Sequence, residues 1–256
     1  MNGYFKKFYI WCSHIGEAVV FFSRALKFII TGKIRFNEVW KQVYEQGAQT
    51  VIIVILTSLA AGAVLAMQGY VSMSRFGAKE YVSHLVALSL VRELGPVFTA
   101  LIFSGKAGAK ITAELGTMNV NDQMTATRAM GVDPMEYFVV PRMLACFLVL
   151  PLLVIIFELV GMFGGYIVGV GQAHLPGAFY LAQTQRAIEY VDFFSGFIKV
   201  FFFAVIIGWT CCFQGFNTKG GSLGVGQHTT NAVAYSYILV IISNTILTKL
   251  ILTIWG

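Results

Sequence analysis

The sequence predicts an all-α integral membrane protein, with an N-terminal interfacial helix followed by five transmembrane helices. Of the 256 residues, 57% are hydrophobic and only 12% are charged, so the chain is far more apolar than an ordinary soluble domain. Uncharged runs recur at residues 46–74, 143–157, 200–218 and 220–248. About 20 apolar helical residues cross a bilayer core. Runs this long, without alternating polarity, favour helices over barrel strands.

Residues 1–256 are expected to form a single membrane domain that begins with an interfacial region at residues 1–40. Aromatic and aliphatic residues alternate there with charged ones such as Lys6, Lys7, Glu17 and Arg24. This mixture suits a helix lying in the membrane interface. The region has no long apolar core followed by a small-residue cleavage site, so we expect it to be retained.

Five spans are predicted at about residues 46–74, 84–108, 141–170, 193–216 and 227–255. With the N-terminus in the cytoplasm, twelve Lys and Arg side chains lie on the inner side, and three, Arg75, Lys79 and Arg186, lie in outer loops. This bias follows the positive-inside rule and predicts an outward-facing C-terminus. The net charge of +6 is then explained by membrane orientation, and no nucleic-acid partner is expected.

The second span carries charges where a bilayer tolerates them poorly. Arg92 and Glu93 stand directly before Gly95 and Pro96. Adjacent helical residues point about 100° apart, so the two charges need separate partners. Ionisable residues at membrane depth usually mark a functional site, and irregular backbone is tolerated beside a wet cavity. We therefore expect a hydrated cavity here. The alternative is a buried ion pair that ties helices together.

An apolar wall for this cavity is predicted from the end of the first span. Leu65, Gly69, Met73 and Phe76 are spaced as one helical stripe, and Leu94 follows Glu93 in the second span. Beside a charged notch, such a stripe suits the acyl chains of a lipid. Taken alone, the stripe is explained more simply by ordinary helix packing.

Residues 114–134 form the longest polar interruption on the predicted cytoplasmic side, and we expect a short helix there that Asn121 caps. Methionines give the segment an adaptable apolar surface framed by charges, which can enter a groove on another protein. A loop lying on its own membrane is the other interpretation. The candidate residues for a partner contact are Glu114, Met118, Asp122, Met124, Arg128, Met130 and Asp133.

Several motifs together make the chain resemble the MlaE permease family. They are LAMQGY at residues 65–70, RELGP at 92–96, AELGTM at 113–118, MGVDP at 130–134, PR at 141–142 and GMFGGYIVGV at 161–170. Their joint occurrence in this order is more specific than any one of them. The resemblance implies the permease subunit of an ABC transporter that moves phospholipids between the inner and outer membranes of Gram-negative bacteria and maintains outer-membrane lipid asymmetry.

The same resemblance implies a homodimer in the bacterial inner membrane that encloses an outward-facing lipid cavity, with Glu93 beside the lipid. It implies a cytoplasmic ABC ATPase, a STAS-domain subunit bound to that ATPase, and a periplasmic hexamer of MCE domains. Residues 114–134 would be the coupling helix region that receives the ATPase stroke.

The chain itself offers no ATP-binding or catalytic motif. No GxxxxGK[ST] sequence occurs, so ATP and Mg are expected to be bound by the partner ATPase, with no cofactor in this chain. The histidines and cysteines lack metal-ligand spacing, and no metal site is expected. Two other functions stay open: an ion-coupled secondary transporter with Glu93 as proton carrier, and a structural membrane anchor for a periplasmic complex.

Overall fold

The computed structural model describes residues 3–31, 34–172 and 175–255, and within these ranges every regular element is helical. The elements are α1 (Gly3–Ile30), α2 (Phe36–Ser74), η1 (Lys79–Tyr81), α3 (Val82–Ser89), η2 (Leu90–Leu94), α4 (Gly95–Phe103), η3 (Ser104–Gly108), α5 (Ala109–Val120), α6 (Gln123–Ala129), η4 (Met135–Val139), α7 (Val140–Gly171), α8 (Gly177–Ala187), α9 (Tyr190–Phe216) and α10 (Gly221–Trp255).

The five predicted membrane-crossing segments are confirmed. Each is long and apolar enough to cross a bilayer, and the segments run over Phe36–Ser74, Lys79–Val120, Met135–Gly171, Tyr190–Phe216 and Gly221–Trp255. All five extend past the predicted bounds, and the second extends by the most. Uncharged runs mark only the part in hydrocarbon, whereas helical hydrogen bonding continues into the polar region beyond it.

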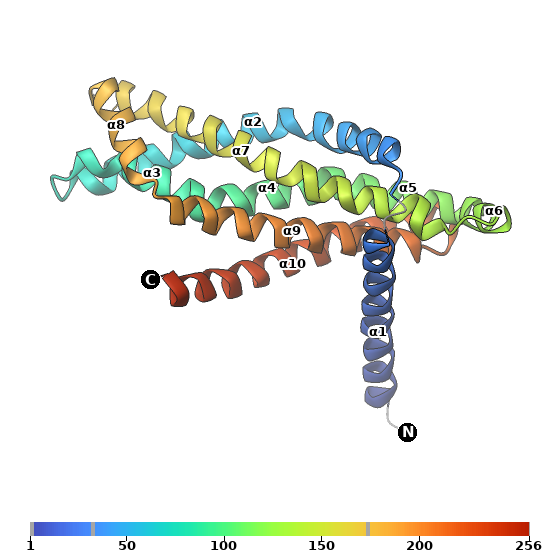
Figure 1. Cartoon of the computed structure of the whole chain (residues 1–256). Helices are drawn as coiled ribbons and strands as arrows, with labels where there is room; N and C mark the ends of the chain where they lie inside the picture. The colour runs from blue at the N-terminus through green and yellow to red at the C-terminus, as the bar shows by residue number, and fades with distance from the viewer. Residues whose placement is uncertain (1–2, 32–33, 173–174, 256) are drawn as a thin grey trace.

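The long helices run side by side as a bundle, and α1 projects from it at a steep angle (Figure 1). Figure 1 also places α6 and α8 at opposite ends of the bundle. The Phe21 ring of α1 packs on Phe213 and Phe216 of α9, and the Trp209 indole donates a 3.0 Å hydrogen bond to the Ala18 carbonyl. This crossing suits a helix that lies along the membrane surface.

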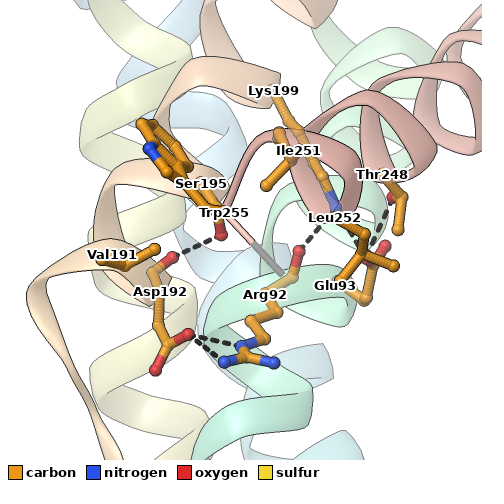
Figure 2. Close-up of a pocket in the computed structure, with 10 residues that line it drawn as sticks. All are labelled: Arg92, Glu93, Val191, Asp192, Ser195, Lys199, Thr248, Ile251, Leu252 and Trp255. Carbon is orange, nitrogen blue, oxygen red and sulfur yellow. Dashed lines mark hydrogen bonds and ion pairs between the residues drawn. The ribbon is translucent and has the colours of Figure 1, made fainter.

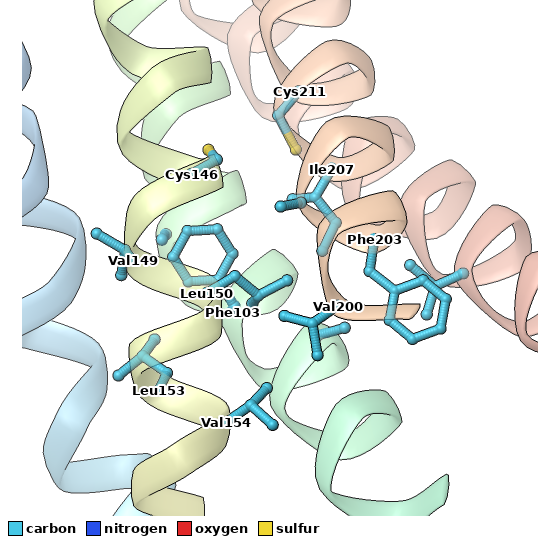
Figure 3. Packing of buried hydrophobic residues seen from close by; sticks show 14 of the residues in the cluster. Phe103, Cys146, Val149, Leu150, Leu153, Val154, Val200, Phe203, Ile207 and Cys211 are labelled. Atoms are coloured by element: carbon cyan, nitrogen blue, oxygen red, sulfur yellow. The ribbon is translucent and has the colours of Figure 1, made fainter. Parts of the chain in front are cut away.

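Small residues let α2 and α7 touch through their backbones. A Cβ atom added at Gly62 would overlap the carbonyl of Gly161, and one added at Gly164 would overlap that of Leu59. Beyond this seam, α7 packs on α4 and α9 through a dry core that includes Phe103, Leu150 and Phe203 (Figure 3). Close backbone approach at small residues is how helices associate in lipid, where apolar side chains gain little by leaving the bilayer.

A short helix, α8, occupies a stretch predicted to be an outer loop. Its Tyr180 is buried against α7, where added Cβ atoms on Gly165 and Gly169 would meet the ring. Burial raises the pKa of Tyr180 to about 12. The spacing of these glycines therefore serves packing within one chain.

The second membrane segment is not a regular α-helix. A π-turn, η2, covers Leu90–Leu94, and the Gly95 amide donates to the Leu90 carbonyl. Pro96 follows in the first turn of α4 and has no amide hydrogen to give. The backbone is thus widened and short of one donor at the charged pair predicted from the sequence.

Candidate functional site

Lys199 of α9 supplies the donor that the widened backbone lacks. Its Nζ atom donates to the Arg92 carbonyl at 2.9 Å and to Glu93 Oε1 at 2.6 Å. The lysine is almost fully buried, so its charge requires these partners. One side chain thus donates hydrogen bonds both to the backbone carbonyl at the helix irregularity and to the carboxylate beside it.

The Glu93 carboxylate has two more partners on α10. Asn244 Nδ2 donates to Oε2 and Thr248 Oγ1 donates to Oε1, both at 3.0 Å. Asn244 and Thr248 are four residues apart and therefore share one face of the helix. Glu93 consequently joins η2, α9 and α10 at a single point.

Arg92 pairs separately with Asp192, near the start of α9. Asp192 is the third residue of the helix and forms a capping box with Glu189, whose amide donates to Asp192 Oδ2 at 3.1 Å. The cap fixes the aspartate, and its other oxygen faces Arg92. The prediction that Arg92 and Glu93 need different partners is confirmed.

Both ion pairs border a cavity of about 130 Å³. Figure 2 shows Arg92 beside Asp192, and Lys199 and Thr248 converging on Glu93. Apolar side chains of α9 and α10 complete the lining, namely Val191, Ile251, Leu252 and Trp255. The volume holds several waters but is below the roughly 300 Å³ of a small ligand pocket. A polar group fits here, whereas long hydrocarbon tails require space outside the cavity.

The two interpretations of the charged stretch both describe part of what is found. The ion pairs tie helices together, as the alternative predicted, but they are not sealed off. The Arg92 side chain is 48% exposed and that of Glu93 is 37% exposed. The site is therefore an ion-paired cluster with one open side.

The predicted apolar wall does not line this cavity. The helical stripe is wrong in its last member, because α2 ends at Ser74 and Phe76 lies in the following turn, 83% exposed. Gly69 packs on Val82 and Leu85 of α3. The side chains of Leu65, Met73 and Leu94 are partly buried against the core. Contact of these five residues with a lipid stays a prediction.

Sequence reasoning missed the four polar partners, Asp192, Lys199, Asn244 and Thr248. A signal for the first two was present: they lie seven residues apart in an apolar segment, two helical turns on one face. Their charges are opposite to those of Arg92 and Glu93, so they were suitable counterparts. Among the described residues, no cluster of three or more His, Cys, Asp or Glu side chains is placed to hold a metal ion.

Some of the candidate coupling residues make contacts within the chain, and others are exposed to solvent. Glu114 points inward, where its Oε2 accepts from Arg142 Nη2 at 3.0 Å and its Oε1 lies 3.7 Å from Lys110 Nζ. Arg142 also donates to the Phe138 carbonyl at 2.9 Å. Glu114 therefore joins α5 to α7 within the chain.

The methionines do not form one exposed surface, which corrects the sequence prediction. Met124 is buried, and Met118 is partly buried against the core, while Met130 is 74% exposed. The expected cap is also wrong: Asn121 is the C-cap of α5, and Asp122, with a positive φ of 56°, is the residue before α6. Of the seven candidate residues, four are exposed: Asp122, Arg128, Met130 and Asp133.

Five membrane-length segments, three of which line an ion-paired, partly open cavity, define a multi-pass membrane protein. The comparisons give its family. The sequence matches the family model described as Permease MlaE over residues 39–250, and the chain belongs to the MlaE permease family.

Similar proteins occur in several bacteria. A probable ABC transporter permease protein of Rickettsia bellii is 39% identical over 92% of this chain and 91% of its own length. The intermembrane phospholipid transport system permease protein MlaE of Haemophilus influenzae is 36% identical over 93% of this chain and 96% of its own. A probable ABC transporter permease protein of Synechocystis is 33% identical over 92% of this chain and 89% of its own.

Proposed function

We propose that this chain is the permease subunit of an ABC transporter that moves phospholipids between the inner and outer membranes, in the bacterial inner membrane. The single observation that carries the proposal is the Arg92 and Glu93 cluster, which keeps polar groups in contact with an open cavity at membrane depth. The Haemophilus relative, which is named as an intermembrane phospholipid transport system permease, supports the choice of phospholipid.

The lipid would bind with its head at the cluster and its tails along apolar surface. Leu65, Gly69, Met73, Phe76 and Leu94 are the proposed tail contacts. The cavity of one chain is too small for a whole lipid, which supports a shared hollow between two copies. The apolar residues on the exposed face of α10, such as Ile238, Ile241 and Ile242, are about half exposed in the single chain.

Energy for transport would come from a partner. A lipid that leaves a bilayer for an apolar cavity gains almost none of the roughly 0.8 kcal/mol per CH₂ that burial from water gives. Work by a cytoplasmic ABC ATPase, which would bind ATP and Mg, would change the shape of the cavity. The proposed assembly also includes a STAS-domain subunit on the ATPase and a periplasmic MCE-domain hexamer.

The exposed part of residues 114–134 is the proposed contact for the ATPase. We expect Asp122→Lys combined with Met130→Asp to release the ATPase without unfolding the spans, because both side chains face outward. Met124→Asp instead places a charge in the core and should destabilise α6. Co-purification of the ATPase with each variant, alongside thermal unfolding of the permease, separates the two effects.

The lipid assignment is tested by counting phospholipids that co-purify with, or crosslink to, the assembled complex. Glu93→Ala and Phe76→Asp should each lower the count several-fold, because one removes the polar anchor and the other places a charge among the tails. Glu80→Gln, at an exposed glutamate of η1, is the matched control. Unchanged lipid in both test variants would refute the cavity assignment.

Two other functions make different predictions. An ion-coupled secondary transporter would move lipid or solute with the permease alone under a pH gradient. A structural anchor would tolerate Glu93→Lys with lipid traffic intact while the complex still assembles. ATP-dependent lipid transfer that needs the partner and is lost in Glu93→Lys would exclude both.

A further inference from the structure

Glu158 is a second acidic residue at membrane depth, and the transport site makes no use of it. It lies near the middle of α7 and is only 6% exposed. No hydrogen bond or ion pair joins it to any other described residue, in contrast to Glu93 with its three partners. A buried acid without a counter-charge requires a physical explanation.

The carboxyl lies against the joint between η2 and α4. A Cβ atom added at Gly95 would be 3.0 Å from Glu158 Cγ and 3.3 Å from its Oε1. One turn further along α7, Gly161 packs on the Leu90 side chain in the same way. These two contacts press α7 onto the widened backbone that carries Arg92 and Glu93.

The surroundings of Glu158 offer no opposite charge. Arg92 and Lys199 already pair with Asp192 and Glu93. α2 carries no charged residue from position 46 to its end at Ser74. None of the other titratable side chains within the membrane spans and on the neighbouring α8 bonds to Glu158 in the described chain. They include Tyr70 on α2, His84 on α3, Cys146 and Tyr166 on α7 itself, Cys211 and Cys212 on α9, and Tyr180 on α8, outside the spans.

An unpaired carboxylate is among the most costly groups to bury, and a carboxyl in such a place takes up a proton instead. We propose that Glu158 is a proton-binding site within the membrane, and that its proton keeps η2 and α4 packed on α7. Loss of the proton would leave a bare negative charge against Gly95. The packing of η2 and α4 on α7 would then loosen, and Arg92 and Glu93, which belong to η2, would move. The inference rests on the contacts of α7 with η2 and α4, and it holds whether or not the substrate is a phospholipid.

The direct test is infrared difference spectroscopy on the full-length permease in lipid nanodiscs as the pH is raised. The wild type should lose a carboxylic-acid C=O band as Glu158 ionises. Glu158→Gln should lack this change, and Glu93→Gln should keep it, because Glu93 is held as a carboxylate by Lys199. A wild type without the band, or a Glu158→Gln variant that retains it, would overturn the proposal.

Thermal unfolding across the same pH range gives a second measurement. The stability of the wild type should fall as the pH rises from the range where a solvated glutamate ionises to the range where Glu158 itself ionises. Glu158→Gln should not show this fall, because its amide does not ionise. Equal pH dependence of the two proteins would contradict the proposed role. So would a Glu158→Gln variant that fails to fold, since the amide is the closest neutral substitute for the protonated acid.

Discussion

The backbone carbonyl of Arg92 explains why a lysine is buried in the membrane at all. Pro96 removes one amide donor from the turn that follows, and Lys199 Nζ fills the gap while also neutralising Glu93. A backbone carbonyl left without a partner in a dry interior costs about 1–3 kcal/mol. The lysine therefore has a structural task as well as an electrostatic one.

This double task predicts an asymmetry between two variants. Lys199→Met should lower the free energy of unfolding by about 2–3 kcal/mol, less than for a fully buried pair because the Glu93 side chain is 37% exposed. Glu93→Gln should cost less, because Lys199 keeps its bond to the Arg92 carbonyl. Thermal or denaturant unfolding in detergent measures both. Equal losses would mean that the carbonyl contact contributes nothing.

For these individual residues, the sequence predicted that Arg92 and Glu93 need partners, but it did not predict which residues those partners are. Arg92 and Glu93 could be recognised because charge in an apolar run is conspicuous. Asp192 and Lys199 lie about a hundred residues further along, so only the packing of α9 on η2 could pair them. Asn244 and Thr248 carry no charge and are common on helix surfaces, so nothing local distinguishes them.

Among the elements, the seam between α2 and α7 tolerates the least change. Gly62→Val would push a side chain into the Gly161 carbonyl, which is backbone and cannot rotate away. We expect the free energy of unfolding to fall by ~3 kcal/mol or more, the upper end of what overpacking costs, and the yield of folded protein to be poor. Gly171→Val, at the exposed end of α7, meets no atom within 4 Å and is the matched control. Similar unfolding midpoints for the two variants would contradict the seam.

The Glu114–Arg142 pair makes a further prediction about how α5 is held to α7. Arg142→Gln should destabilise by about 2–4 kcal/mol, because Glu114 loses its closest cation and the Phe138 carbonyl loses a donor. Adding Glu114→Gln should cost little more. A double-mutant cycle of unfolding free energies measures this coupling, and strictly additive losses would show that the pair is not a unit.

Helix positions could be predicted from the sequence far better than helix ends. Long apolar stretches located all five spans, four of them as uncharged runs, because hydrocarbon favours apolar residues whatever the tertiary packing. The same criterion stopped the second span too early, since α5 continues to Val120 through Lys110 and Glu114. It missed α8 because that helix contains polar residues and owes its place to Tyr180 in the α7 glycine groove. The Met124 error arose because the left-handed turn at Asp122 decides which side of α6 faces the core.

For the whole molecule, five spans among the described residues place the start of the first span and the end of the last on opposite sides of the membrane. Figure 1 places α6 and the start of α2 at one end, and α8 and the turn between α2 and α3 at the other. The first end carries most of the Lys and Arg residues outside the spans. By the positive-inside rule, we expect that end to face the cytoplasm.

This topology predicts opposite labelling of two single cysteines in a variant whose four native cysteines are replaced. Glu80→Cys, exposed on η1, should react with a membrane-impermeant maleimide that has crossed only the outer membrane, whereas Ala129→Cys, exposed on α6, should react only after the inner membrane is opened. Glu80 sits in the turn with few cations, and Ala129 sits beside Arg128 in the cation-rich end. Inverted labelling would place the cation-rich end outside the cytoplasm. The proposed ATPase contact would then lie on the side of the membrane that has no ATP, and the proposal would fail.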